Sequence, residues 1–102
     1  MKPLEPKIYS LKVCLKQSDC LQVNRLCSDL GIVPENANEI GEDDWGHRGY
    51  LDLWFQEITD KSIILNIQKQ RNKTAKKYME NLQQFFDDLH SLEYVESVVD
   101  LG

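Results

Sequence analysis

Apolar residues recur at three- and four-residue steps over residues 72–92, with polar residues between them. This spacing predicts an amphipathic helix that buries one face and exposes the other to water. No Pro or Gly interrupts the segment, and Asn72 or Thr74 can cap its first turn with a short polar side chain. The apolar positions of this helix are Ala75, Tyr78, Met79, Leu82, Phe85, Phe86, Leu89 and Leu92.

Four other segments alternate between apolar and polar residues, which predicts half-buried strands. They are residues 8–16, 50–56, 63–68 and 94–101. A tight turn at residues 59–62 would join the second and third strands into a hairpin. A shorter helix is expected after the first strand, beginning at Ser18 and ending before Gly31. Its apolar face consists of Val23, Leu26, Cys27 and Leu30.

The order of these elements is β-α-β-β-α-β. This order predicts an α+β, ferredoxin-like domain, with a four-stranded antiparallel sheet and two helices on one face. Residues 1–102 would form this single domain. Residues 1–7 would be a loose lead-in because they contain two prolines, and residues 33–49 would be a long acidic loop.

The same alternation assigns strand residues to a helix-facing side or to an open face. The residues expected to face the helices are Leu11, Leu53, Phe55, Leu65 and Val99. The residues expected on the open face are Lys12, Cys14, Tyr50, Asp52, Trp54, Gln56, Asn66, Gln68 and Glu96. Exposed aromatic rings there would form a docking surface, unless residues 35–48 or a second copy of the chain cover them. The pattern leaves these alternatives open.

Charge narrows the range of partners. The net charge of −5 argues against nucleic acid or an anionic membrane as the main partner and favours a cationic protein. Residues 35–60 hold eight carboxylates and one Arg, whereas residues 61–77 hold six Lys and Arg and no acid. The basic block lacks a glycine-rich phosphate loop, so we interpret it as a solvated helix start. Three cysteines without paired spacing, and no apolar signal segment, indicate a cytoplasmic protein.

The acidic segment also contains a possible metal-binding sequence. Residues 42–47 combine three acids with one His, but their spacing matches no calcium loop. No Cys or Ser is brought beside a His by any recognisable pattern. We therefore expect no catalytic site, no metal and no cofactor, and predict a partner-binding surface instead. Its residues are Glu39, Glu42, Asp43, Asp44, Trp45, His47, Tyr50, Asp52 and Trp54.

Two resemblances bear on function. The run from Leu30 to Pro34, followed by Gly41-Glu42 and Trp45, resembles the L-G-x-x-P, G-[E/D], W pattern of a family of small bacterial proteins recorded only as a domain of unknown function. As a short, acidic chain with aromatic residues and no catalytic set, it is also similar to bacterial immunity proteins, including those of contact-dependent growth inhibition. That similarity implies a tight, stoichiometric inhibitor of a toxin, often a basic nuclease.

Three functional hypotheses follow. The first is an immunity protein that covers the active site of a cationic toxin domain, with carboxylates meeting Lys and Arg and aromatic rings as anchors. The second is a regulatory or ligand-sensing domain that dimerises through its sheet, so the oligomeric state, monomer or homodimer, stays open. The third, an enzyme using the acidic loop and His47, has the least support.

Overall fold

The computed structural model of the chain describes residues 8–17, 22–35 and 40–101. Six strands and two helices make up this part, which confirms the α+β class. The strands are β1 (Tyr9–Leu15), β2 (Val33–Pro34), β3 (Trp45–Arg48), β4 (Leu51–Gln56), β5 (Ser62–Lys69) and β6 (Val95–Asp100). The helices are α1 (Gln22–Asp29) and α2 (Ala75–Ser91). The predicted lead-in, the predicted cap Ser18, and Cys20 lie outside the described residues.

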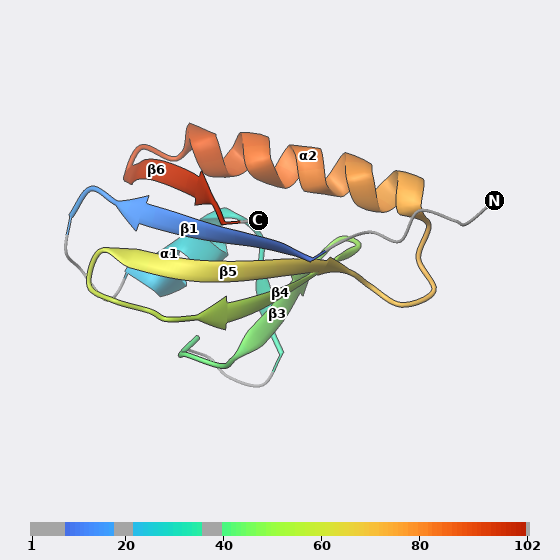
Figure 1. Cartoon of the computed structure of the whole chain (residues 1–102), viewed down its shortest axis with the longest axis horizontal. Helices are drawn as coiled ribbons and strands as arrows, with labels where there is room; N and C mark the ends of the chain where they lie inside the picture. The colour runs from blue at the N-terminus through green and yellow to red at the C-terminus, as the bar shows by residue number, and fades with distance from the viewer. Residues whose placement is uncertain (1–7, 18–21, 36–39, 102) are drawn as a thin grey trace.

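The six strands form one antiparallel sheet in the order β2-β3-β4-β5-β1-β6 (Figure 1). β5 and β1 are neighbours, with Val13 opposite Ile63, although far apart in sequence. The β4–β5 hairpin turns at residues 57–61, where the Thr59 hydroxyl accepts hydrogen bonds from the backbone N–H groups of Lys61 and Ser62. The hairpin predicted from the sequence is therefore present.

The predicted four-stranded ferredoxin-like sheet is wrong, because the sheet has six strands. The two additional strands, β2 and β3, lie within residues 33–49, the segment predicted to be a loop. They contain two and four residues, too few for alternation to be recognised in the sequence. Gly46 permits their close approach, since a Cβ at this position would lie 2.6 Å from the carbonyl oxygen of Val33.

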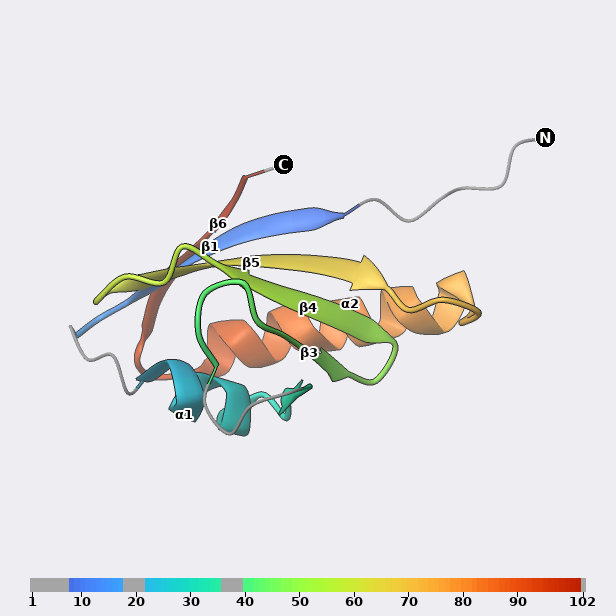
Figure 2. The same ribbon diagram turned by 90° about the horizontal axis from the view of Figure 1, so that it is seen from below.

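Both helices lie on one side of the sheet (Figure 2). Between the sheet and the helices, the buried apolar residues of the described chain form one cluster. It includes Val13 and Leu65 from the central strands, Leu26 from α1 and Phe85 from α2, all with no exposed surface. Because both helices cover this face, no helix covers the opposite face of the sheet, which is the open face.

The long helix is shorter than predicted and buries a narrower stripe. Thr74 is its N-cap, with the hydroxyl accepting a hydrogen bond from the backbone N–H of Lys77 at 3.3 Å. Met79 was assigned to the apolar face but is 49% exposed. The buried stripe consists of Tyr78, Leu82, Phe85 and Leu89. At the end of α1, Gly31 has a φ of +67°, the conformation that glycine adopts without strain at a helix C-terminus.

The last strand has a different register from the one predicted. Val99 was expected to face the helices, but it lies opposite Lys12 and is 45% exposed. The pairing with β1 shifts between Cys14 and Leu15, as at a β-bulge. An irregularity of this kind changes which residues point to each face, because the side-chain period of a strand is two. Val98 packs against the core instead.

Candidate functional site

Two tryptophans lie side by side on the open face. Trp45 on β3 is directly opposite Trp54 on β4, and their side chains are 37% and 47% exposed. Cβ atoms of such cross-strand pairs are about 5 Å apart, so the two indoles are neighbours. Asn66 on β5 continues the row beyond Trp54, and Ser10 on β1 completes it. Four strands thus contribute one row of side chains to this face.

A second row runs parallel to the first. It contains His47 on β3, Asp52 on β4 and Gln68 on β5, each opposite the next. Asp52 is half-buried. Its position between an imidazole and an amide, two residues from Trp54 on the same strand, places a carboxylate next to the aromatic pair.

Parts of both rows line a groove of about 750 Å³, namely Trp45, Trp54 and Asn66 of the first row and Asp52 and Gln68 of the second. The rest of the described lining consists of Asp43, Ile8 just before β1, and further residues of β4 and β5. Two carboxylates and no Lys or Arg contribute to the described lining, so the groove is acidic in character. Its volume lies within the range of sites that bind small ligands or a partner's side chains.

Asp43 reaches the groove through an irregularity in the chain before β3. The backbone N–H of Asp43 donates to the Phe55 carbonyl, and the Phe55 N–H donates to the Asp44 carbonyl, both at 2.9 Å. Asp43 and Asp44 therefore both lie opposite Phe55, as in a β-bulge whose first residue has a left-handed backbone conformation. Asp43 has a φ of 70°, which Asp tolerates better than most residues other than glycine. The bulge brings the acidic segment to the edge of the aromatic pair.

The amide wall of the groove is held by its own hydrogen bonds. Ser10 Oγ donates to Asn66 Oδ1 at 2.6 Å, and Asn66 Nδ2 donates to Gln56 Oε1 at 2.8 Å. This chain fixes the orientation of the Asn66 amide across three strands.

Tyr50 does not belong to this surface. It was predicted on the open face beside Trp54, but it lies in the turn between β3 and β4, is half-buried and packs against the core. Its backbone N–H donates to Asn81 Oδ1 on α2 at 2.8 Å, and Lys73 Nζ lies 5.2 Å from the centre of its ring. The alternation of β4 begins only at Leu51, which is why the sequence pattern misassigned its neighbour.

The remaining predicted acids are dispersed. Asp44 Oδ2 accepts a hydrogen bond from the Gly41 N–H at 2.7 Å, so it stabilises the turn before β3. Glu42 is exposed in that turn and does not line the groove. Glu39 lies outside the described residues. His47 lies opposite Asp52 but does not line the groove, and its Nδ1 is 3.6 Å from a carboxylate oxygen of Glu35.

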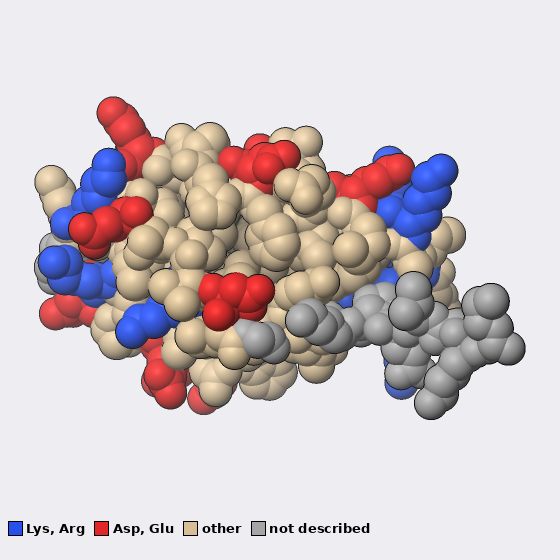
Figure 3. All heavy atoms as spheres, turned by 45° about the horizontal axis from the view of Figure 1, so that its top comes forward, with Lys and Arg blue, Asp and Glu red and all other residues tan. Residues whose placement is uncertain are grey.

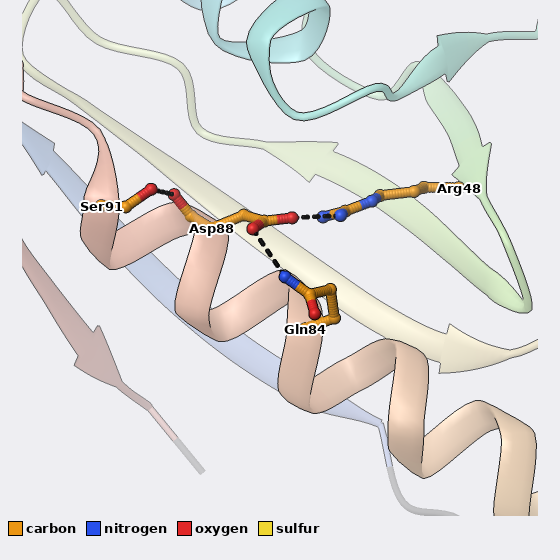
Figure 4. Close-up of polar contacts among 4 residues, drawn as sticks. All are labelled: Arg48, Gln84, Asp88 and Ser91. Carbon is orange, nitrogen blue, oxygen red and sulfur yellow. Dashed lines mark hydrogen bonds and ion pairs between the residues drawn. The ribbon is translucent and has the colours of Figure 1, made fainter.

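An ion pair anchors the groove's edge strand to the helical layer. Arg48, at the end of β3, donates through Nη2 to Asp88 on α2, and Gln84 Nε2 donates to the same carboxylate at 2.8 Å (Figure 4). Hydrogen bonds from Arg48 and Gln84 lower the pKa of Asp88 below its usual range. The Arg48 guanidinium also lies 5.5 Å from the ring centre of Phe85. The sequence pattern did not predict this contact, although Arg48 is the only Lys or Arg among residues 35–60.

The described lining of the groove contains no Lys or Arg, although Lys12 is exposed on the same face, opposite Ile64. In the view of Figure 3 the Lys and Arg side chains gather toward the two ends of the molecule, and the middle is largely uncharged with scattered acids. Lys69 Nζ donates to the carbonyls of Gln70 and Lys73, which closes the loop before α2. Lys69, one of the six basic residues at positions 61–77, thus stabilises this loop.

The groove lacks the usual groups of nucleophilic catalysis. Its described lining contains no Ser, Cys or His. Cys27 is buried in the core, and burial raises the pKa of its thiol to about 12. In the described part of the chain, no group of three His, Cys, Asp or Glu could hold a metal ion. The arrangement is chemically suited to binding a cation or a cationic surface.

Among the described residues, no helix is long and apolar enough to cross a membrane. Comparison of the chain with protein-family models, curated proteins and solved structures found no match.

Proposed function

We propose that this protein is a cytoplasmic immunity-type inhibitor, which uses the open face of its sheet to bind and neutralise a cationic toxin domain. The supporting observation is the exposed Trp45–Trp54 pair in a groove whose described lining carries two carboxylates and no base. Tryptophan is enriched among the residues that dominate binding energies, because it buries a large area with few rotatable bonds.

Electrostatic attraction would govern the rate of association, and the tryptophans would govern the rate of dissociation. The chain carries a net charge of −5, and the acidic turn at residues 41–44 adjoins the groove. Opposite charge on a toxin domain would speed the encounter, particularly at low salt. The aromatic pair would then slow dissociation, because fully desolvated anchors mainly control the off-rate.

The face is also rigidly supported. Leu53 and Phe55 alternate with the groove residues of β4 and are fully buried beneath them. The Arg48–Asp88 ion pair ties the end of β3 to α2. A preformed surface loses less entropy on binding than a mobile one, which favours a tight complex.

The test is to mix the purified protein with the toxin domain encoded by the adjacent gene and to measure affinity by calorimetry. Trp54→Ala should weaken binding by about thirtyfold or more, the loss of about 2 kcal/mol that defines a binding hot spot. Met79→Ala, which removes an exposed apolar side chain from α2, is the matched control and should leave affinity unchanged. Both altered side chains are about half exposed, so the fold should survive each change.

Absence of a complex at low salt would contradict the proposal for that partner. Self-association through the same tryptophans is the rival arrangement, and sedimentation of the protein alone distinguishes it. A stable homodimer that dissociates on Trp54→Ala would favour the homodimeric regulatory role over inhibition of a toxin.

A further inference from the structure

The two carboxylates that line the groove are not used within the chain. In the described part, neither the Asp43 nor the Asp52 side chain has a hydrogen-bond or ion-pair partner. Asp44, the residue after Asp43, by contrast accepts a hydrogen bond from the Gly41 N–H. Hydrogen bonds within the chain thus fix the Asn66 amide on one side of the groove, whereas the Asp43 and Asp52 carboxylates are available to accept hydrogen bonds from a ligand.

The available groups differ in what they can recognise. A carboxylate can accept two parallel N–H donors from a guanidinium, and the face of an indole can stack on the same planar cation. A Lys ammonium is a compact, strongly hydrated charge that cannot stack in this way. The combination of Trp45 and Trp54 with Asp43 and Asp52 in one groove therefore matches a guanidinium better than an ammonium.

We propose that the groove between Trp45, Trp54, Asp43 and Asp52 binds the guanidinium group of an arginine side chain. This inference deepens the proposed function and rests on it, because the arginine would belong to the cationic partner. The groove volume of about 750 Å³ leaves space for the peptide on either side of that arginine. One arginine would then be the central contact of the complex, with the acidic turn around it.

The test uses the full chain and three blocked tripeptides, Gly-Arg-Gly, Gly-Lys-Gly and Gly-citrulline-Gly. Citrulline has nearly the shape of arginine without its charge. Binding is followed by tryptophan emission and by the two indole N–H signals in NMR spectra. The arginine peptide should shift both signals saturably, and citrulline should bind at least about tenfold more weakly, the usual cost of losing a charged hydrogen bond. Lysine should also bind more weakly than arginine.

Two isosteric variants identify the groups responsible. Asp52→Asn should weaken binding of the arginine peptide about tenfold and reduce the advantage over citrulline. Asp87→Asn, a change at an exposed acid on α2, is the matched control and should have no effect. Equal binding of arginine and citrulline, or an Asp52→Asn variant that binds as well as the original protein, would overturn the inference.

The outcome is separable from the proposed function. If the toxin complex forms and depends on Trp54 but no arginine peptide shifts the indole signals, the arginine inference fails and the binding role stands. If the arginine peptide binds selectively but no toxin domain does, the groove is confirmed as a guanidinium site and the immunity role fails.

Discussion

Arg48 and Asp88 show how a single pair connects the site to the helical layer. Arg48 leaves the end of β3 on the side opposite to the tryptophans and reaches α2, where the carboxylate also accepts from Gln84. Nη1 of Arg48 is buried without a hydrogen-bond partner in the described chain, so the guanidinium depends on Asp88 and on the Phe85 ring. Removal of the Asp88 carboxylate would leave the partly buried Arg48 guanidinium without its ion-pair partner.

The lowered pKa of Asp88 predicts a specific pH dependence of stability. Folding favours the ionised carboxylate, so this contribution is present above the ordinary pKa of 3.8 and is lost as the pH falls through the lower folded value. Asp88→Asn should reduce the free energy of unfolding by less than about 1 kcal/mol at neutral pH, because the side chain is 36% exposed. Urea titrations should show this difference shrinking toward zero below pH 3.8.

The adjacent Asp87→Asn variant serves as the control for this prediction. Asp87 is exposed and accepts only from Gln83 in the described chain, at 3.0 Å. Its effect on stability at neutral pH should be smaller than that of Asp88→Asn. A difference between Asp88→Asn and the original protein that stays constant into acid would contradict the role assigned to the ion pair.

At the scale of elements, β2 and β3 determine where the sheet ends and where Trp45 lies. β2 contains only two residues, and Pro34 cannot donate a backbone hydrogen bond, so this edge offers little to a further strand. β2 packs close to β3 because Gly46 has no side chain. The Glu35 N–H donates to the Trp45 carbonyl at 3.0 Å and extends the contact. The position of the first tryptophan thus depends on a glycine one residue later.

Gly46→Ala should therefore separate β2 from β3. Its Cβ would meet the Val33 carbonyl oxygen at 2.6 Å, a contact that forces the backbone to move. Overpacking of this kind costs about 1–3 kcal/mol, and the Glu35 amide should lose its protection from hydrogen exchange. Gly41→Ala is the control, because the nearest atom to its Cβ would be 3.4 Å away. Unchanged exchange at Glu35 would show that the edge tolerates a methyl group.

At the scale of the whole molecule, one face of the sheet is buried and the other is available. Helices cover the first, and their apolar stripes close a single cluster over the central strands. Cys27 lies inside this cluster, 3% exposed, and burial raises the pKa of its thiol to about 12. Because the thiolate is the reactive form, Cys27 can be modified only when the helical layer opens.

Labelling of Cys27 should consequently report global unfolding. In a Cys14→Ser, Cys20→Ser variant, alkylation should be about a thousandfold slower than in denaturing urea, as expected for a stability of at least 4–5 kcal/mol. The rate should rise with urea in parallel with the unfolding transition. The reciprocal variant that keeps only Cys14, which is half-buried on the open side, should react sooner. Fast labelling of Cys27 in the native protein would contradict this packing.

Sequence pattern was sufficient where a long element buries one face. α2 and strands β1, β4 and β5 were predicted because at least six residues alternate or recur in each, and burial of one side requires that repetition. The same alternation predicted Asp52, Trp54, Gln56, Asn66 and Gln68 on the open face, and all except Asp52 and Asn66, which are half-buried there, are exposed. These positions follow from the local period of the strands.

Long-range contacts decided the rest. β2 and β3 are strands because they pair with neighbouring strands, and sequences of two and four residues cannot indicate this pairing. The Tyr50 N–H donates to Asn81 on α2, and Val99 points outward in β6, where Glu96 is an extra residue between the pairs Cys14–Ser97 and Leu15–Val95. The sequence alone determined the helix, the central strands and the acidic, aromatic character of the surface. Only the tertiary structure brought Trp45 opposite Trp54 with Asp43 and Asp52, because strand pairing joins residues that no local pattern relates.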